Sequence, residues 1–220
     1  MAAGAIDNGL TLLLARLLGH QAGDAGFLMD QASTFIFSAR SFEQRTELVT
    51  KIASFTFAAG ISEPKHSYHY KVAIFLTKLL NAIISSAKSN KWIRNLAAHG
   101  SLSPASGELK LVPVSFDFLG PKALKLRGAE FADGLTLQQV VHHRSKLNLD
   151  GTRLLNYTMT LSKALLTSLE IPELFLEEMN RLAQGLGVTP IHLVGPHEPR
   201  PPRQRRPTRQ QQSEPEQTEG

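Results

Sequence analysis

The chain contains no cysteine. This absence excludes disulfides, cysteine-ligated zinc, iron–sulfur clusters and thiol nucleophiles as the basis of its chemistry. The sequence also lacks the Gly-rich phosphate loop, the Gly-x-Ser-x-Gly nucleophile motif and the Gly-rich dinucleotide fingerprint. The enzyme classes that depend on these motifs are therefore not indicated.

Long apolar runs and an export signal are absent as well. Residues 1–9 carry Asp7 and no Lys or Arg, and Arg16 interrupts the apolar stretch that begins at Leu10. No run approaches the roughly 20 apolar residues that a membrane-spanning helix needs. We therefore expect a soluble, cytoplasmic protein.

The composition divides the chain of 220 residues into two parts. Apolar residues make up 42% of it, which is enough for a hydrophobic core, and they support one domain over residues 1–194. From Gly195 onward Pro, Arg, Gln and Glu dominate, so residues 195–220 are expected to be a disordered tail. The arginines of this tail either attract RNA or acidic lipids weakly, or are simply solvated.

Helical periodicity dominates the domain. Leu10–Leu18 is a first short amphipathic helix, and residues 22–39 are a candidate for another. Ser41 and Gln44 form a capping box that opens a helix ending at Gly60. One face of that helix is expected to carry Phe42, Val49, Ile52 and Phe55.

The most regular helical pattern runs from about His66 to Lys88. Its apolar positions recur at i, i+3, i+4 and i+7 and comprise Val72, Phe75, Leu76, Leu79, Leu80 and Ile83. Ser89–Lys91 is a candidate break before Trp92.

A strand pattern follows later in the chain, where Val112, Val114, Phe116 and Phe118 alternate with Pro113, Ser115 and Asp117. Gly120-Pro121 and the alternation around Leu124 and Leu126 complete a predicted β-hairpin, in which Pro113 suits an edge strand.

The C-terminal part of the domain is again helical. Thr136 and Gln139 form a second capping box before a long helix in which Val140, Leu147, Leu154 and Leu161 keep a seven-residue spacing. Asp150-Gly151 is a possible interruption, and Pro172 suits the first position of a last helix. The fold class is all-α: a bundle of four to six helices with a small inserted β-hairpin.

The chemically most specific segment is Arg94-Asn95-Leu96-Ala97-Ala98-His99-Gly100. Arg, a polar residue directly after it, a four-residue gap and then His resemble the motif of the HEPN superfamily, whose members are helical bundles. This resemblance implies a metal-independent endoribonuclease or an RNA-binding protein without a cofactor or metal. It further implies a homodimer with its cleft at the two-fold interface and, in a toxin–antitoxin or defence setting, a cognate antitoxin as partner.

The residue types of the motif suit phosphodiester cleavage. Histidine transfers protons near neutral pH, so His99 is the candidate general base or acid. The guanidinium of Arg94 matches phosphate oxygens, and Asn95 can donate to a phosphate or hold the histidine in one tautomer. The alternative is that His99 caps its helix and Arg94 pairs with a carboxylate, in a non-catalytic dimeric scaffold or regulatory module.

Helix geometry constrains this site. Five residues correspond to about 500° of rotation, so Arg94 and His99 would point about 140° apart on an ideal helix. They converge only if the helix ends between them, with Gly100 as the residue after its end, or if two chains meet. The site is therefore predicted to depend on a helix terminus or on a partner subunit.

Other candidates carry weaker signals. His66 and His69 share a helix face but lack further ligands for a metal. His142 and His143 are adjacent and face different directions, which favours solvated or core-edge side chains. Trp92 is either a base-stacking residue or, more often in such positions, a core residue. Glu43 and Glu47 share a face that either reaches the site or is merely solvated.

Overall fold

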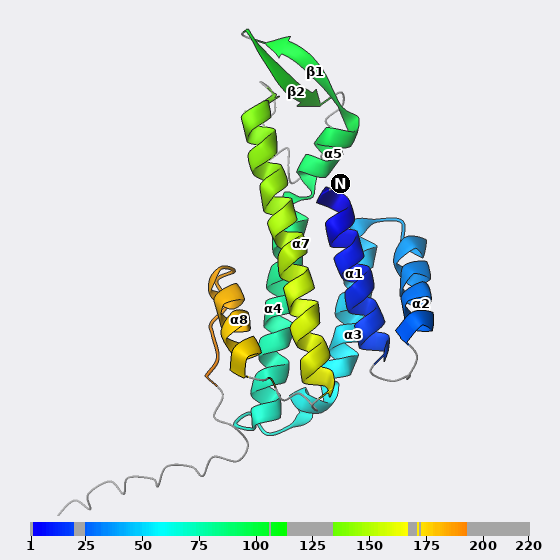
Figure 1. Cartoon of the computed structure of the whole chain (residues 1–220), viewed down its shortest axis with the longest axis vertical. Coiled ribbons are helices and arrows are strands. Elements are labelled where there is room, and N and C mark those ends of the chain that lie inside the picture. Colours follow the sequence, from blue (N-terminus) through cyan, green and yellow to red (C-terminus); the bar gives the residue numbers. More distant parts are fainter. Residues whose placement is uncertain are drawn as a thin grey trace, which may run out of the picture.

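The computed structural model describes residues 2–19, 25–105, 107–113, 134–166, 171 and 173–192. It is mostly helical with a small three-stranded antiparallel sheet, so the predicted helical bundle with a β insert is confirmed (Figure 1). The strand residues expected beyond Pro113, including Leu124 and Leu126, lie outside the described residues. The expected tail, 195–220, lies outside them too.

Helix α1 (Ala2–Gly19) begins earlier than its apolar pattern suggested and lies in the centre of the bundle. It packs against α2 (Ala25–Ser38), α3 (Phe42–Ser62) and α7 (Leu137–Leu166). Leu10, Leu13, Leu14 and Leu17 are buried along it. The largely buried pair of Asp7 and Arg45, with 3.0 Å between carboxylate and guanidinium, connects α1 to α3.

Helix α3 begins as predicted, because both hydrogen bonds of the Ser41–Gln44 capping box are present at 3.1 Å. Two details of the prediction are wrong. The helix continues past Gly60 to Ser62, and its buried face carries Val49, Ala53 and Phe57, whereas Phe55 is 80% exposed. Phe55 is two positions from both Ala53 and Phe57, and two positions correspond to about 200° of rotation on a helix. It therefore lies opposite the face on which α1 and α4 pack.

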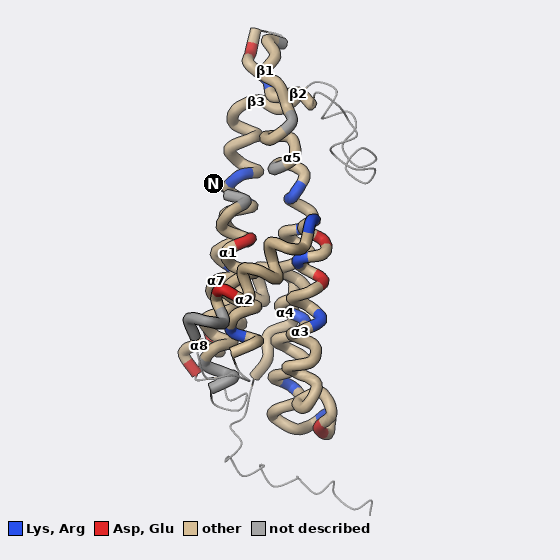
Figure 2. The backbone as a smooth tube through the Cα atoms, turned by 90° about the vertical axis from the view of Figure 1, so that its right-hand side faces the viewer, with Lys and Arg blue, Asp and Glu red and all other residues tan. Residues whose placement is uncertain are grey.

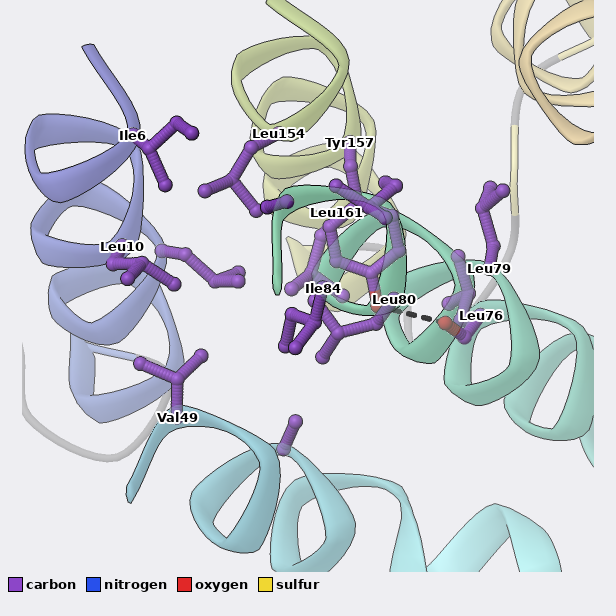
Figure 3. Packing of buried hydrophobic residues seen from close by; sticks show 14 of the residues in the cluster. Ile6, Leu10, Val49, Leu76, Leu79, Leu80, Ile84, Leu154, Tyr157 and Leu161 are labelled. Atoms are coloured by element: carbon purple, nitrogen blue, oxygen red, sulfur yellow. Dashed lines mark hydrogen bonds between the residues drawn. The ribbon is translucent and has the colours of Figure 1, made fainter. Parts of the chain in front are cut away.

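Helices α4 (Tyr68–Asn90) and α7 lie side by side, and α4 contributes the largest set of buried core residues (Figures 1 and 3). Every residue of the predicted α4 stripe is buried, which confirms it. Tyr157 of α7 is fully buried, and its hydroxyl donates a 3.0 Å hydrogen bond to the carbonyl oxygen of Leu76. Figure 3 shows this hydrogen bond among the surrounding leucines.

The long helix α7 runs through Asp150-Gly151 without interruption, so the possible break there is not present. Gly151 is explained by helix packing instead. A Cβ at Gly151 would lie 3.1 Å from the Cβ of Ala5, and a Cβ at Gly9 would lie 2.9 Å from Leu154. The two glycines therefore allow α1 and α7 to approach closely. The capping box at Thr136 and Gln139 is confirmed by hydrogen bonds of 2.9 and 3.3 Å.

The last described segment is α8 (Glu173–Gln184), which packs on α7 through the buried Met179 and Ala183. The chain after it turns at Gly187, whose φ of 70° favours glycine, and the N–H of Val188 donates to the carbonyl of Ala183. The Asn180 side chain both donates to and accepts from the backbone of Ile191, at 2.8 and 2.9 Å.

The sheet is made of β1 (Gly100–Ala105), β2 (Glu108–Pro113) and β3 (Leu135–Thr136), in that order. Strand β1 was not predicted, and it pairs with β2 directly after the motif helix. The expectation that Pro113 lies on an edge strand is wrong, because β2 is the central strand. Pro113 is its last residue, opposite Gly100 of β1 and beyond the two residues that pair with β3.

One stretch of the described chain, Tyr68–Ala98, has the length and composition of a membrane-spanning helix. Half of its most apolar window is buried inside the bundle.

Candidate functional site

The Arg94–His99 motif forms its own short helix, α5 (Trp92–His99), at the end of the bundle next to the sheet (Figure 1). Helix α4 ends at Asn90, and Lys91 alone separates the two helices, as the expected break at Ser89–Lys91 suggests. Helix α5 packs against α4, α7 and the first two strands. The motif thus joins the bundle to the sheet.

The helix does not end between Arg94 and His99, because His99 is its last residue. Gly100 has φ −85° and ψ 159°, so it is extended and opens β1 while its N–H donates to the carbonyl of Leu96. A Cβ at Gly100 would collide with that carbonyl and lie 2.9 Å from Leu111. Glycine is required here for close packing, not for a left-handed helix cap.

The backbone of α5 therefore separates the two motif residues. Trp92, Ile93 and Leu96 are buried and define the inner face, whereas Ala97 and Ala98 are exposed. Position 94 lies about 150° from the centre of the inner face, on the same side as the two alanines. The side chains of Arg94 and His99 lie outside the described part of the structure.

A second face of α5 borders the inner one. Positions 92, 95 and 99 follow one another at i, i+3 and i+7, within an arc of about 60°. Asn95 is half-buried on this stripe. The backbone thus groups Asn95 with position 99 and leaves position 94 on the outer face.

Trp92 is a core residue with 5% of its surface exposed, which supports the interpretation of this tryptophan as part of the core. Its ring and the ring of His143 from α7 form a T-shaped contact, with 4.7 Å between centroids. His143 is half-buried and His142 is exposed, so the two adjacent histidines differ as expected. The contact with the motif helix was not foreseen.

His143 belongs to the inward stripe of α7. The members of this stripe follow alternating steps of three and four residues and are Val140, His143, Leu147, Asp150, Leu154, Tyr157 and Leu161. The predicted heptad positions, Val140 to Leu161, are four of the seven members of this stripe. The other members of the stripe lie three residues after each heptad position. Including these positions in the predicted pattern would have identified His143 from the sequence.

Asp150, the other polar member of the stripe, is 1% exposed and fully engaged. Its two carboxylate oxygens accept hydrogen bonds from Ser86 at 2.8 Å and Asn90 at 2.9 Å, and Arg153 pairs with it at 3.2 Å. Because Asn90 is the last residue of α4, this network holds the backbone directly before α5. The buried charge is compensated, as such groups must be.

A groove of about 480 Å³ lies between α3 and α4 and includes Glu43 and Glu47. Glu43 pairs with Lys91, next to the motif helix, and Glu47 pairs with Lys51 at 2.8 Å. The hydrogen bond from Lys51 lowers the pKa of Glu47. Charges of both signs alternate along this side, so the groove is not a strongly cationic surface (Figure 2).

Nothing in the described part of the chain forms a metal site, since no group of three or more His, Cys, Asp and Glu residues comes together there. His69 instead meets the edge of the neighbouring Tyr68 ring, at 5.8 Å between centroids.

Comparison with protein-family models, with curated proteins and with solved structures gave no match for this chain.

Proposed function

We propose that the protein is a HEPN-like, metal-independent endoribonuclease of the cytoplasm whose site is completed by a second copy of the chain. The observation that carries this proposal is the division of α5 into two faces. Asn95 and position 99 share one stripe, whereas position 94 shares the outer face with the exposed Ala97 and Ala98. Two small side chains on an exposed face allow another helix to approach closely. A partner's Arg94 can then complete the site.

The proposed reaction is an intramolecular transesterification. One proton-transfer group removes the proton of the RNA 2′-hydroxyl, and the 2′-oxygen forms a bond to phosphorus. The bond to the 5′-oxygen breaks, that oxygen receives a proton, and a 2′,3′-cyclic phosphate remains. His99 acts as general base or acid, Arg94 stabilises the charge on the phosphorane, and Asn95 orients the histidine or the phosphate.

The decisive experiment measures cleavage of structured and unstructured RNAs in excess chelator. Wild-type protein is expected to produce 2′,3′-cyclic ends, and His99→Ala and Arg94→Ala are each expected to be inactive. Arg16→Ala, at an exposed position of α1, is the control for loss of a positive charge. Equal cleavage by wild type and both motif variants would refute the proposal.

Mixing the two inactive variants tests whether the site is shared. A mixed dimer has one site with both the Arg of one chain and the His of the other, and one site with neither. Random exchange gives mixed dimers in half of the population, so about a quarter of wild-type activity is expected to return. If each site lay within one chain, mixing would restore nothing.

A second candidate function is a non-catalytic interaction module of the same fold. A stripe of exposed apolar side chains on α7 favours it, and comprises Leu137, Val141, Leu155 and Met159. Leu102 and Leu109 of the hairpin are exposed too, on one face of the sheet. Such surfaces mark protein-binding sites in soluble proteins. The cognate antitoxin that the HEPN resemblance implies is a partner of this kind.

A further inference from the structure

We propose that His143 is the second proton-transfer residue of the site, acting on the same phosphodiester as His99. This inference rests on the proposed ribonuclease function and adds a residue from α7 to the three of the motif.

The first support is the position of His143 in the bundle. The inward stripe of α7 is otherwise built from apolar side chains, from Tyr157 and from Asp150, whose partners are all within hydrogen-bonding distance. A half-buried imidazole on such a stripe is a departure from core packing. Departures of this kind concentrate at functional sites.

The second support is what His143 touches. Its ring contacts Trp92, the first residue of the stripe that continues to Asn95 and position 99. Helices α5 and α7 pack on each other and are connected through the sheet, so they run in opposite directions (Figure 1). Position 99 lies about 10.5 Å further along α5 than Trp92, so His143 lies beside the first residue of the stripe and position 99 is its last.

The ring of His143 meets Trp92 of α5 and His142 of its own helix, and Arg144 and Lys146 are the charged residues closest to it along α7. A phosphodiester along the stripe would bring negative charge to an imidazole that can gain a proton.

The third support is the chemistry. Transesterification needs one group that accepts the proton of the 2′-hydroxyl and another that donates a proton to the departing 5′-oxygen. A single histidine cannot do both within one step, and neither Arg94 nor Asn95 exchanges protons near neutral pH. With His143 in place, one imidazole takes up a proton while the other releases one, so the step is balanced.

The kinetic test compares His143→Gln with His142→Gln. Glutamine keeps hydrogen-bonding capacity but does not titrate, and His142 is the exposed neighbour on the same helix. We expect His143→Gln to lower kcat about 10²- to 10³-fold with little change in KM, and to remove one limb of a bell-shaped pH profile. His142→Gln should keep both limbs. If wild-type protein cleaves RNA and His143→Gln keeps the wild-type pH profile and rate, this inference alone is refuted. If wild-type protein does not cleave RNA, the proposed function is refuted as well.

A second readout does not depend on activity. Trp92 is the sole tryptophan of the chain, and a protonated imidazole against an indole ring quenches its fluorescence. Titrating wild-type emission between about pH 4.5 and 8.5 should report the protonation of His143, with a midpoint that is absent in His143→Gln and kept in His142→Gln. An oligonucleotide with a 2′-deoxy residue at the cleavage position should raise this midpoint, because a nearby phosphate favours the imidazolium. An unmoved midpoint with the oligonucleotide bound would mean that His143 does not meet the phosphate.

Discussion

At the scale of single residues, buried polar side chains set the relative positions of α4 and α7. Asp150 binds Ser86 and Asn90 across this interface, and Tyr157 binds the carbonyl of Leu76 two turns further along the pair. Apolar contacts alone tolerate sliding of one helix along another, whereas these hydrogen bonds are lost when the register changes. They therefore hold α5, and with it the motif, at one height in the bundle.

The Tyr157 hydroxyl leads to a prediction about pH. Burial raises the pKa of this phenol above its ordinary value near 10, so the folded protein keeps the proton when the unfolded chain releases it. The protonated phenol of Tyr157 therefore makes its full contribution to the free energy of unfolding below about pH 10. Above pH 10 this contribution falls by about 1.4 kcal/mol per pH unit. Tyr157→Phe should cost about 1 kcal/mol at neutral pH, and its stability should equal that of wild type near pH 11.

Urea unfolding measured from pH 7 to 11 checks this, with Tyr70→Phe as the control for removing a phenol from a half-buried position. A constant difference between Tyr157→Phe and wild type over the whole range would contradict the expected role of burial.

The site was only partly predictable at this scale. Arg94, Asn95 and His99 form a motif that can be found in the sequence, because their order and spacing are local. His143 lies 44 residues beyond His99 in the chain, and only its place in the heptad pattern of α7 distinguishes it from His142. Its contact with Trp92 appears only when α7 packs against α5.

At the scale of elements, the approach of α1 to α7 depends on glycines within regular helices. Glycine inside a helix costs about 1 kcal/mol relative to alanine, so its presence needs a compensating contact. At Gly9 this compensating contact is the packing of Leu154 against the α1 backbone. At Gly151 it is the close approach of Ala5 to the α7 backbone. This is also why Asp150-Gly151, which resembles a helix break in the sequence, lies inside a continuous helix.

Two alanine substitutions in the same helix should have opposite effects. A Cβ at Gly4 would meet no atom within 4 Å, so Gly4→Ala should stabilise the protein by about 0.5 kcal/mol through helix propensity. A Cβ at Gly9 would lie 2.9 Å from the buried Leu154, so Gly9→Ala should destabilise it by about 1 kcal/mol despite the same gain in propensity. Chemical denaturation of both variants checks this, and a stabilised Gly9→Ala would mean that α1 and α7 are further apart.

At the scale of the whole molecule, two separate surfaces are available for association. The outer face of α5 exposes Ala97 and Ala98 beside position 94, whereas the stripe of α7 exposes larger apolar side chains such as Leu155 and Met159. The proposed function assigns the two-fold contact to α5, because only that contact adds an Arg94 to the partner's site. The α7 stripe is then free to bind another protein.

The oligomeric state distinguishes the two surfaces. Wild-type protein is expected to be a dimer, and Ala98→Glu should weaken it about 100-fold or more, because an unpaired carboxylate would be buried between the helices. Leu155→Glu, at an exposed position of α7, should leave the dimer intact. Sedimentation velocity over a range of concentrations measures both. If Leu155→Glu dissociates the dimer and Ala98→Glu does not, the dimer interface lies on α7, and the proposal of a shared site is refuted.

The sequence by itself determined the elements whose signals are local. The capping boxes at Ser41 and Thr136 and the apolar stripe of α4 depend on residues within a few positions of one another, and all are present in the structure. Tertiary packing decided the rest, because the outcome depends on residues far apart in the chain. Gly100 is extended because Leu111 and β2 lie against it, and α7 continues through Gly151 because Ala5 fills the space beside it. Helix geometry separates position 94 from position 99, whereas the packing of α7 on α5 brings His143 to Trp92.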